Sequence, residues 1–437
     1  MLRRSGASTN ACGSGINCLP TSRIDARAVL ILGPLQFREF RLLFAARAIS
    51  LTGSAIAPIA LAFGVLQATG EATDLGIVLF ARQGIETVLL LGGGVLADRV
   101  DRRLVMVGGS LASCVSEAAI GALFLTHSAN LLLLCVFAMI DGLGDALFFP
   151  ASAGLTPSTV DPEHLQKANS LIGFARNGSS IFGAALGGVL VAVIGPGLGI
   201  EIDSVSFLVA AVLIALLRAT PRAREERSGL FAELREGWSE FRSRTWLWTI
   251  VVQFAFVNVA IAGTLFVLVP LRALHSYGGA GAYGLLIAIF SVGSLFGGGL
   301  MLRFHPRRPL VAATFGILII VPDFVLLAIG APLPIVLVAA FIGGIGTEVF
   351  GVLWITTMQR EIPADLLSRV SSYDALGSLV FTPIGLAVAA PVAIAVGLSG
   401  AFWIGAGLLA VPTLLVLGVG DVRRMRSPEP ASARSAS

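Results

Sequence analysis

Charged residues are scarce in this chain of 437 residues, since Asp, Glu, Lys and Arg together make up 13%. In soluble globular domains about a quarter of the residues are charged, because they must cover a solvated surface. The shortage therefore excludes a soluble enzyme, and the high apolar content excludes a disordered chain. Hydrophobic residues account for 56% of the chain, and 51 glycines add to them. This composition predicts an all-α polytopic membrane protein whose surface contacts the lipid bilayer.

Cysteine is rare as well, and its four copies suggest neither a metal site nor a redox motif. Cys12 and Cys18 lie in the polar N-terminal stretch, where we expect them to be cytosolic and reduced, while Cys114 and Cys135 lie in apolar segments. No Cys-x-x-Cys pair occurs, and the four histidines lack metal-ligand spacing. We therefore expect no metal and no cofactor.

Lysine occurs once, at Lys167, in the context LQKANS. That context is not a phosphate-binding loop, which argues against a pump driven by nucleotide hydrolysis. Two protease-like strings also fail. Gly142-Leu-Gly144-Asp145 and Tyr373-Asp374 stand in the reverse order of the intramembrane aspartyl proteases, and no histidine follows His305 to serve the serine of Gly397-Leu-Ser399-Gly400. We expect no catalytic residues.

Twelve apolar segments are each long enough for a helix of about 20 residues that crosses a bilayer. A polar stretch from Arg218 to Arg244 divides them into two sets of six. The first set lies near 41–68, 75–97, 104–126, 129–156, 166–194 and 198–217, and the second near 246–271, 281–302, 309–330, 333–358, 366–394 and 398–420.

Five regions follow from this pattern. They are a mostly disordered cytosolic tail (1–37) without the apolar core of a signal peptide, an N-terminal six-helix bundle (38–217), a cytoplasmic linker (218–245), a C-terminal six-helix bundle (246–420) and a second cytosolic tail (421–437). Leu230, Leu234, Trp238 and Phe241 recur at helical spacing in the linker. An amphipathic helix there would lie either on the membrane surface or in solvent.

The basic residues set the orientation of the spans. With twelve spans, nearly all of them fall on one side, including Arg99, Lys167 and Arg307, and Arg272 is the clear exception. Because positive residues stay in the cytoplasm, both termini are expected there. The net charge of +4 is thereby explained by topology, and no nucleic-acid partner is expected.

The segment between the second and third spans has the sequence GVLADRVDRR, starting at Gly94. It resembles the cytoplasmic loop motif of the major facilitator superfamily, G-x-L-A-D-R-x-G-R-R, with Asp101 in place of the second glycine. The resemblance implies two six-helix bundles that rock around a central cavity. It also implies a latch in which the aspartate meets the N-terminus of the eleventh helix. The latch residues would be Gly94, Asp98, Arg99, Arg102 and Arg103.

The second half repeats this segment. GGGVLADRVDRR, starting at Gly92, aligns without gaps to GGGLMLRFHPRR, starting at Gly297. Arg303 stands where the first copy has Asp98, so the latch is expected on one side only.

Two further motifs resemble those of bacterial exporters. Gly183-Ala-Ala-Leu-Gly187-Gly188-Val-Leu is similar to the exporters' motif G-P-x-x-G-G-x-L, although alanine replaces the proline, and its small residues predict close helix packing. The fourth span has D-A-x-x-x-P-A from Asp145, which is similar to the branch that contains enterobactin exporters and macrolide efflux proteins. The arginine that many drug/proton antiporters carry on this helix is replaced by Ala138.

Charged residues within the spans are the candidates for proton coupling or for a substrate cavity, because such residues are costly in lipid. They are Arg82, Glu86, Glu117, Asp141, Asp145, Arg176 and Glu348. Asp141 and Asp145 are one helical turn apart and cannot both ionise cheaply in a cavity, so one is expected to hold a proton. Arg82 and Glu86 are also one turn apart, and a neutralised structural pair is the alternative for them.

Four other charged residues lie nearer the ends of the predicted spans. We expect Arg47, Asp203, Asp323 and Asp374 to reach toward the interface or to cap helices.

The resulting hypothesis is a monomeric secondary transporter. It would export an amphipathic small molecule, such as a drug, an antibiotic or a siderophore-like compound, across the bacterial plasma membrane in exchange for protons. Import of a small nutrient is the alternative, and a non-transporting receptor is a remote one, since a receptor would typically carry a folded soluble domain.

Overall fold

The computed structural model describes residues 33–99, 101–161, 164–218, 238–301, 303–304 and 306–426. At residues 90–99, 149, 150, 153, 154, 166, 170, 364, 365, 368 and 369 the description covers the backbone only. The predicted tail with Cys12 and Cys18, most of the predicted linker and the last eleven residues lie outside these ranges.

The N-terminal half is helical throughout its described length. After a short 3₁₀ turn (η1, Gly33–Gln36) come α2 (Arg38–Ser54), α3 (Ala57–Thr69), α4 (Ala72–Arg99), α5 (Arg102–Leu125), α6 (Leu131–Leu155) with η2 (Thr156–Ser158), α7 (Leu165–Ile194) and α8 (Pro196–Ala215). α2 and α3 form one span with a break, because Pro58 at the start of α3 has no N–H to donate to the preceding turn.

The C-terminal half repeats this plan with more interruptions. Its elements are α10 (Thr245–Gly263), the π-helical turn η4 (Thr264–Leu268), α11 (Val269–Arg272), a second π-helical turn η5 (Ala273–Tyr277), α12 (Ala280–Met301), α13 (Pro309–Leu318), α14 (Val321–Ala328), α15 (Leu333–Glu361), α16 (Ala364–Leu379), α17 (Thr382–Leu417) and α18 (Gly420–Arg424). Gly397 has a φ of 80°, a backbone angle that glycine adopts readily. It divides α17 between two successive spans.

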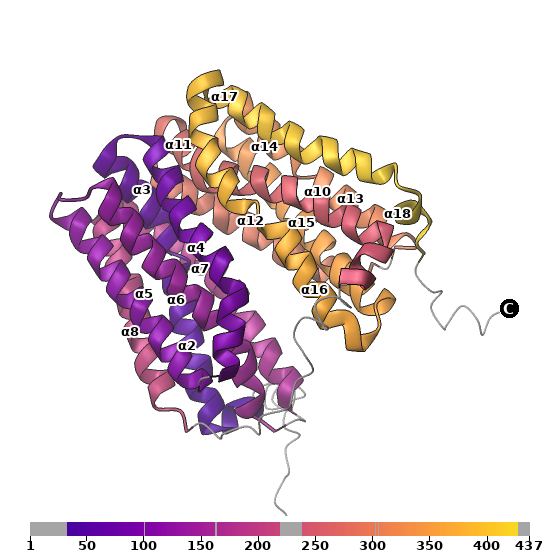
Figure 1. Cartoon of the computed structure of the whole chain (residues 1–437). Coiled ribbons are helices and arrows are strands. Elements are labelled where there is room, and N and C mark those ends of the chain that lie inside the picture. The colour runs from indigo at the N-terminus through magenta and orange to yellow at the C-terminus, as the bar shows by residue number, and fades with distance from the viewer. Residues whose placement is uncertain are drawn as a thin grey trace, which may run out of the picture.

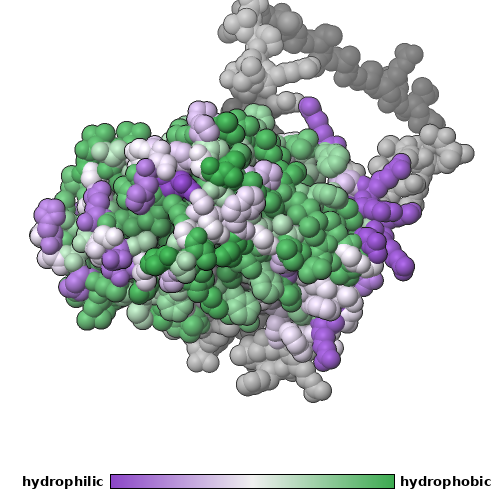
Figure 2. Space-filling view, turned by 90° about the horizontal axis from the view of Figure 1, so that it is seen from above, coloured by the Kyte–Doolittle hydropathy of each residue, from purple (hydrophilic) through white to green (hydrophobic). Residues whose placement is uncertain are grey.

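Within the described residues, ten helical runs are long and apolar enough to cross a membrane. The run at 370–417 contains two spans because of the turn at Gly397, and the 28-residue helix α4 supplies another. The described chain therefore has twelve spans, six in each half, as the sequence predicts. In a bilayer helices of this length satisfy all their backbone hydrogen bonds internally. Seen from above, the surface is mostly apolar, with hydrophilic residues in separate patches (Figure 2).

The two halves meet at one end and separate toward the other (Figure 1). They join where α7 packs along α12 and where α4 packs along α17. A Cβ at Gly188 of α7 would lie 3.0 Å from Cα of Gly284 in α12, and one at Gly76 would lie 2.6 Å from the carbonyl oxygen of Leu386. These glycines bring the backbones of opposite halves together at the end where α7 finishes and α12 begins.

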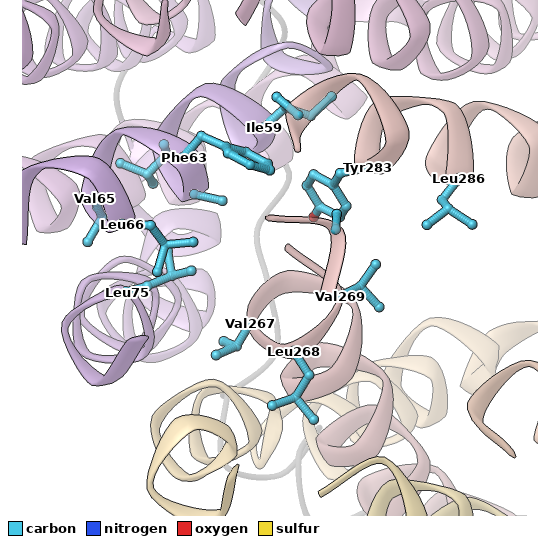
Figure 3. Packing of buried hydrophobic residues seen from close by; sticks show 14 of the residues in the cluster. Ile59, Phe63, Val65, Leu66, Leu75, Val267, Leu268, Val269, Tyr283 and Leu286 are labelled. Atoms are coloured by element: carbon cyan, nitrogen blue, oxygen red, sulfur yellow. The ribbon is translucent and has the colours of Figure 1, made fainter. Parts of the chain in front are cut away.

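An apolar cluster closes the same end (Figure 3). Phe63 of α3 packs against Tyr283 of α12, with 6.2 Å between the ring centroids. Leu66 and Leu75 of the N-terminal half lie in the same cluster as Leu268 of the C-terminal half. The opposite end, where α2, α7 and α16 begin, is the open one (Figure 1).

We expect the substitution Gly188→Val to disfavour this conformation, in which the two halves are separated at one end. The new Cβ would lie 2.9 Å from the carbonyl oxygen of Ala280 and 3.0 Å from Cα of Gly284, so α7 and α12 would have to separate. Spin labels placed at the open ends of α2 and α16 should then report shorter distances. Gly173→Val is the matched control on the same helix, since a Cβ there meets nothing within 4 Å. Equal distance distributions in the two variants would contradict the role of Gly188.

Candidate functional site

Arg82 on α4 joins two carboxylates of α6. Its Nε lies 2.7 Å from Oδ2 of Asp141, and its Nη2 lies 2.5 Å from Oδ2 of Asp145. The two aspartates are four residues apart and share one face of α6, so a single guanidinium can reach both. Arg82 therefore offsets the repulsion between Asp141 and Asp145. The sequence does not reveal this contact between α4 and α6.

Two glycines between the aspartates allow this geometry. A Cβ at Gly142 would lie 2.3 Å from the carbonyl oxygen of Arg82, so the backbone of α4 can approach only because that position is glycine. Gly144 faces the other way, and a Cβ there would lie 2.8 Å from the carbonyl oxygen of Gly109 in α5. The sequence between the aspartates thus fits α6 between α4 and α5 and fixes the two carboxylates against Arg82.

Glu86 lies one turn beyond Arg82 on α4 and is a weaker partner. Its Oε2 is 3.9 Å from Nη1 of Arg82, and it accepts a hydrogen bond of 3.0 Å from Gln83. The predicted Arg82–Glu86 pair is therefore present as a long ion pair, while the shorter contacts of the guanidinium are with Asp141 and Asp145 of α6. About a quarter of the Glu86 side chain and a third of the Asp145 side chain are exposed, at 27% and 34%.

Behind these residues lies a second pair of acids, Glu117 on α5 and Asp203 on α8. The two carboxyl groups act on each other electrostatically, and Ser206 donates a 2.7 Å hydrogen bond to Oδ1 of Asp203. Glu117 is 4% exposed and Asp203 is 0% exposed. Two carboxyl groups can share a hydrogen bond only when one of them is protonated. We therefore expect this buried pair to hold a proton, which would relieve the repulsion between the two carboxylates.

Asp203 is the residue that sequence reasoning missed. It was expected near a helix end, but it is fully buried within α8, and a Cβ at Gly53 of α2 would lie 2.2 Å from its Oδ1. Serines at 204 and 206 and at 110, 113 and 116 of the packed helix α5 are also buried. This matching run of small polar residues was the signal that could have identified it.

Together these groups form an acidic cluster of five carboxyl groups around one arginine, made up of Arg82, Glu86, Glu117, Asp141, Asp145 and Asp203. Asp141 connects its two layers, since it binds Arg82 and acts electrostatically on both Glu117 and Asp203. Five negative charges against one positive would give a net charge of −4. Such a charge is very costly away from bulk water, so the cluster must bind protons.

A cavity of about 150 Å³ opens onto this cluster. Arg82, Glu117, Asp141 and Asp203 line one wall. The rest of the lining is mostly apolar and includes Leu61, Phe207, Phe266 and Leu386. Most of the lining belongs to the N-terminal half, and Phe266 and Leu386 come from the C-terminal half, so the cavity lies in the N-terminal bundle where it meets the other half.

The remaining predicted cavity residues lie apart from the acidic cluster. Arg176 of α7 interacts electrostatically with Glu348 of α15, across the two halves, and with Arg47 of α2. The predicted set is therefore divided into the acidic cluster and a second, basic group. Arg47 was expected near the interface, yet it lies in the interior of α2.

Asp323 and Asp374 were likewise expected to reach toward the interface or to cap helices. Asp323 does lie in the first turn of α14, but Asp374 lies inside α16 and accepts a 3.1 Å hydrogen bond from the indole of Trp354. Asp374 is therefore part of the packing between α15 and α16.

The glycines of the exporter-like motif contact two different helices. A Cβ at Gly183 would lie 2.5 Å from Cβ of Ala55, and one at Gly187 would lie 3.0 Å from Cα of Ile56. Both therefore face the break in the first span, whereas Gly188 faces Gly284 in the other half. The three positions connect the first span, α7 and α12.

The loop motif is described only in part. Only the backbone is described at Gly94, Asp98 and Arg99, so the latch stays a prediction. Asp101, which departs from the family pattern, caps α5 by accepting a 2.9 Å hydrogen bond from the backbone N–H of Arg103. Arg103 in turn donates a hydrogen bond to the carbonyl oxygen of Ala215, and the side chain of Arg102 is half-buried.

Residues 43–380 match the family model described as Major Facilitator Superfamily. The chain is 29% identical to the multidrug efflux pump Tap of Mycolicibacterium fortuitum, an alignment that covers 89% of this chain and 94% of the relative. It is 25% identical to the enterobactin exporter EntS of Citrobacter koseri (90% and 94% covered). It is also 25% identical to macrolide efflux protein A of Streptococcus pyogenes (89% and 97% covered).

Solved structures share the fold at low identity. A bacterial homologue of the iron transporter ferroportin, in an inward-facing state, superposes with a TM-score of 0.70 at 16% identity, covering 89% of this chain and 99% of that one. The nucleoside transporter NupG superposes with a TM-score of 0.70 at 10% identity and with the same coverage.

Proposed function

Because the chain belongs to the major facilitator superfamily, we propose that it is a proton-driven exporter of amphipathic small molecules in the bacterial plasma membrane. It is a multi-pass membrane protein of a transporter family, and transporters of this fold work by rocking two bundles around a central site. The direction of transport, the coupling ion and the class of substrate are the parts that we propose.

The names of the relatives support export. Tap, EntS and macrolide efflux protein A are each named as an efflux pump, an exporter or an efflux protein. They are matched over 94–97% of their own lengths, so the likeness extends through both bundles. The cavity is largely apolar, which suits an amphipathic substrate.

The acidic cluster is the observation that carries proton coupling. Asp145 and Glu86 are partly exposed, whereas Glu117, Asp141 and Asp203 are buried in the wall of the cavity. A proton that reaches Asp145 would weaken its bond to Arg82, and Asp141 offers a route toward the inner pair. Protonation and deprotonation of these carboxyl groups would therefore change how strongly α4 binds α6.

The arrangement of the halves fits one step of an export cycle. With both termini in the cytoplasm, as the basic residues predict, the open end of the molecule faces the cytoplasm. In that state the cavity would take up substrate and release protons. Closure of this end would then involve the loop latch at Asp98. We expect a single chain to complete the cycle, without a cofactor.

The proposal is tested with inside-out membrane vesicles whose lumen is acidified. A proton-driven exporter should accumulate at least one of three probes, erythromycin, ethidium or enterobactin, and nigericin should abolish the accumulation. Asp145→Asn and Glu86→Gln should abolish it as well, because each removes a titrating group of the acidic cluster. Glu71→Gln is the control, since Glu71 is an exposed residue outside the cluster.

Two results would overturn the proposal. Accumulation that continues without a proton gradient would remove the coupling. Protein-dependent uptake into right-side-out vesicles, driven by protons moving in the same direction, would identify an importer.

A further inference from the structure

We propose that Arg47 and Arg176 form a binding site for an anionic group on the transported molecule, such as a carboxylate, a sulfonate or an ionised catechol. The inference rests on the proposed transport function and specifies the substrate class. It places substrate recognition on a pair of arginines, separate from the acidic cluster that handles protons.

Arg176 lies on the face of α7 that meets the opposite half. One turn further along α7, the hydroxyl of Ser180 is 2.9 Å from the hydroxyl of Ser291 in α12. Ala184 lies one turn beyond Ser180, and its carbonyl oxygen is close to Gly284 of α12. Gly188 lies one turn further and also faces Gly284. Residues four apart share a helix face, so Arg176 continues this line toward the open end. It therefore lies one turn from the contact between Ser180 and Ser291, on the side of the open end.

Arg47 lies on the face of the first span that meets the cavity. Ser54, Pro58 and Leu61 follow it at helical spacing, and all three line the cavity. At 1.5 Å per residue, Arg47 is about 14 Å along α2 from Arg38, and Arg176 is about 16 Å along α7 from Leu165. The two arginines thus lie at similar distances from the first residues of their helices, which begin at the open end.

Neither arginine has a hydrogen bond or an ion pair with any other residue that the structure describes. Their electrostatic interaction with each other is repulsive. Arg82, by contrast, has two carboxylate partners. Charged side chains within a membrane normally find partners, so two neighbouring arginines without one indicate a position for an anion that arrives from solution.

Glu348 sets the charge that the site accepts. It is the acidic residue of α15 that attracts Arg176 from the opposite half, without coming within ion-pair distance. Two arginines and one glutamate give a net charge of +1, which favours a ligand with a single negative charge.

The test compares two probes with the same ring system. 1-Anilinonaphthalene-8-sulfonate carries one sulfonate, and N-phenyl-1-naphthylamine lacks it. Binding to the purified full-length protein in nanodiscs is followed by fluorescence. Arg47→Gln and Arg176→Gln should each weaken binding of the sulfonate probe by about tenfold, the loss expected for one charge-assisted hydrogen bond. Binding of the neutral probe should change less than twofold.

Arg41→Gln is the matched control, since Arg41 is exposed in the first turn of α2. Arg176→Lys keeps the charge and should retain most of the binding even if the glutamine variant folds poorly. Equal losses for both probes, or no loss for the sulfonate probe, would overturn the anion site. Because this assay uses no gradient, a failure of export in vesicles and a failure of anion binding are separate results.

Discussion

Replacing Arg82 with glutamine is expected to abolish export and to destabilise the N-terminal bundle. Arg82 is the positive charge of a cluster that holds five carboxyl groups, and it bonds directly to two of them. Removing one partner of a buried ion pair costs about 3–5 kcal/mol, because the other charge is left without compensation. The Arg82 side chain is 30% exposed, so we expect about 3 kcal/mol, measured by chemical denaturation of the purified protein.

Two further variants separate loss of charge from loss of geometry. Arg82→Lys should show little more export than Arg82→Gln, because an ammonium group cannot bridge Asp141 and Asp145 as a planar guanidinium does. Arg82→Gln combined with Asp145→Asn should regain part of the stability, since one uncompensated carboxylate is removed. An Arg82→Gln variant with wild-type stability and wild-type export would show that the acidic cluster is not a functional unit.

Glu117→Gln and Asp203→Asn are expected to preserve the fold while removing the proton that the inner pair shares. A carboxamide can donate a hydrogen bond to the remaining carboxylate, so we expect the contact between α5 and α8 to survive the change. The infrared band of a protonated carboxyl group should disappear in each variant. Export driven by a proton gradient should fall at least tenfold, while exchange of substrate across the membrane without a gradient should continue.

Glu71→Gln is again the control, since its side chain is exposed outside the acidic cluster. Glu117→Ala provides the contrast, because it leaves Asp203 buried with only Ser206 as a hydrogen-bond donor. It should therefore destabilise the protein where Glu117→Gln does not. If both glutamine and asparagine variants retain full proton-driven export, the inner pair serves packing alone.

The sequence predicted the fold because lipid imposes simple rules on it. Long apolar segments must form helices, and their number, six plus six, could be counted. Breaks inside spans were harder to predict. Pro58 breaks the first span into α2 and α3, whereas Gly397 is the turn between two spans, and only the backbone angles separate these two cases. The capping role of Asp101 depends on the geometry of a single turn.

The sequence predicted most residues of the candidate site, but not which of them contact one another. The scarcity of charge made Arg82, Asp141 and Asp145 stand out, because charged residues in spans are costly. Which carboxylates Arg82 binds most closely depends on how α4 packs on α6, so spacing along one helix indicated only its longer contact, with Glu86. Asp203 and Arg47 were placed at helix ends because distance along a segment does not reveal which face a side chain occupies.

The most direct test of a proton-driven exporter measures lumenal pH in proteoliposomes that are preloaded with probe and have no initial pH gradient. Departure of the probe through an antiporter must bring protons in, so the lumen should acidify with the wild-type protein and not with Asp145→Asn. The probe would be whichever of erythromycin, ethidium and enterobactin the vesicles accumulate. Departure of the probe without a pH change, or with a lumen that becomes alkaline, would contradict proton antiport through the acidic cluster.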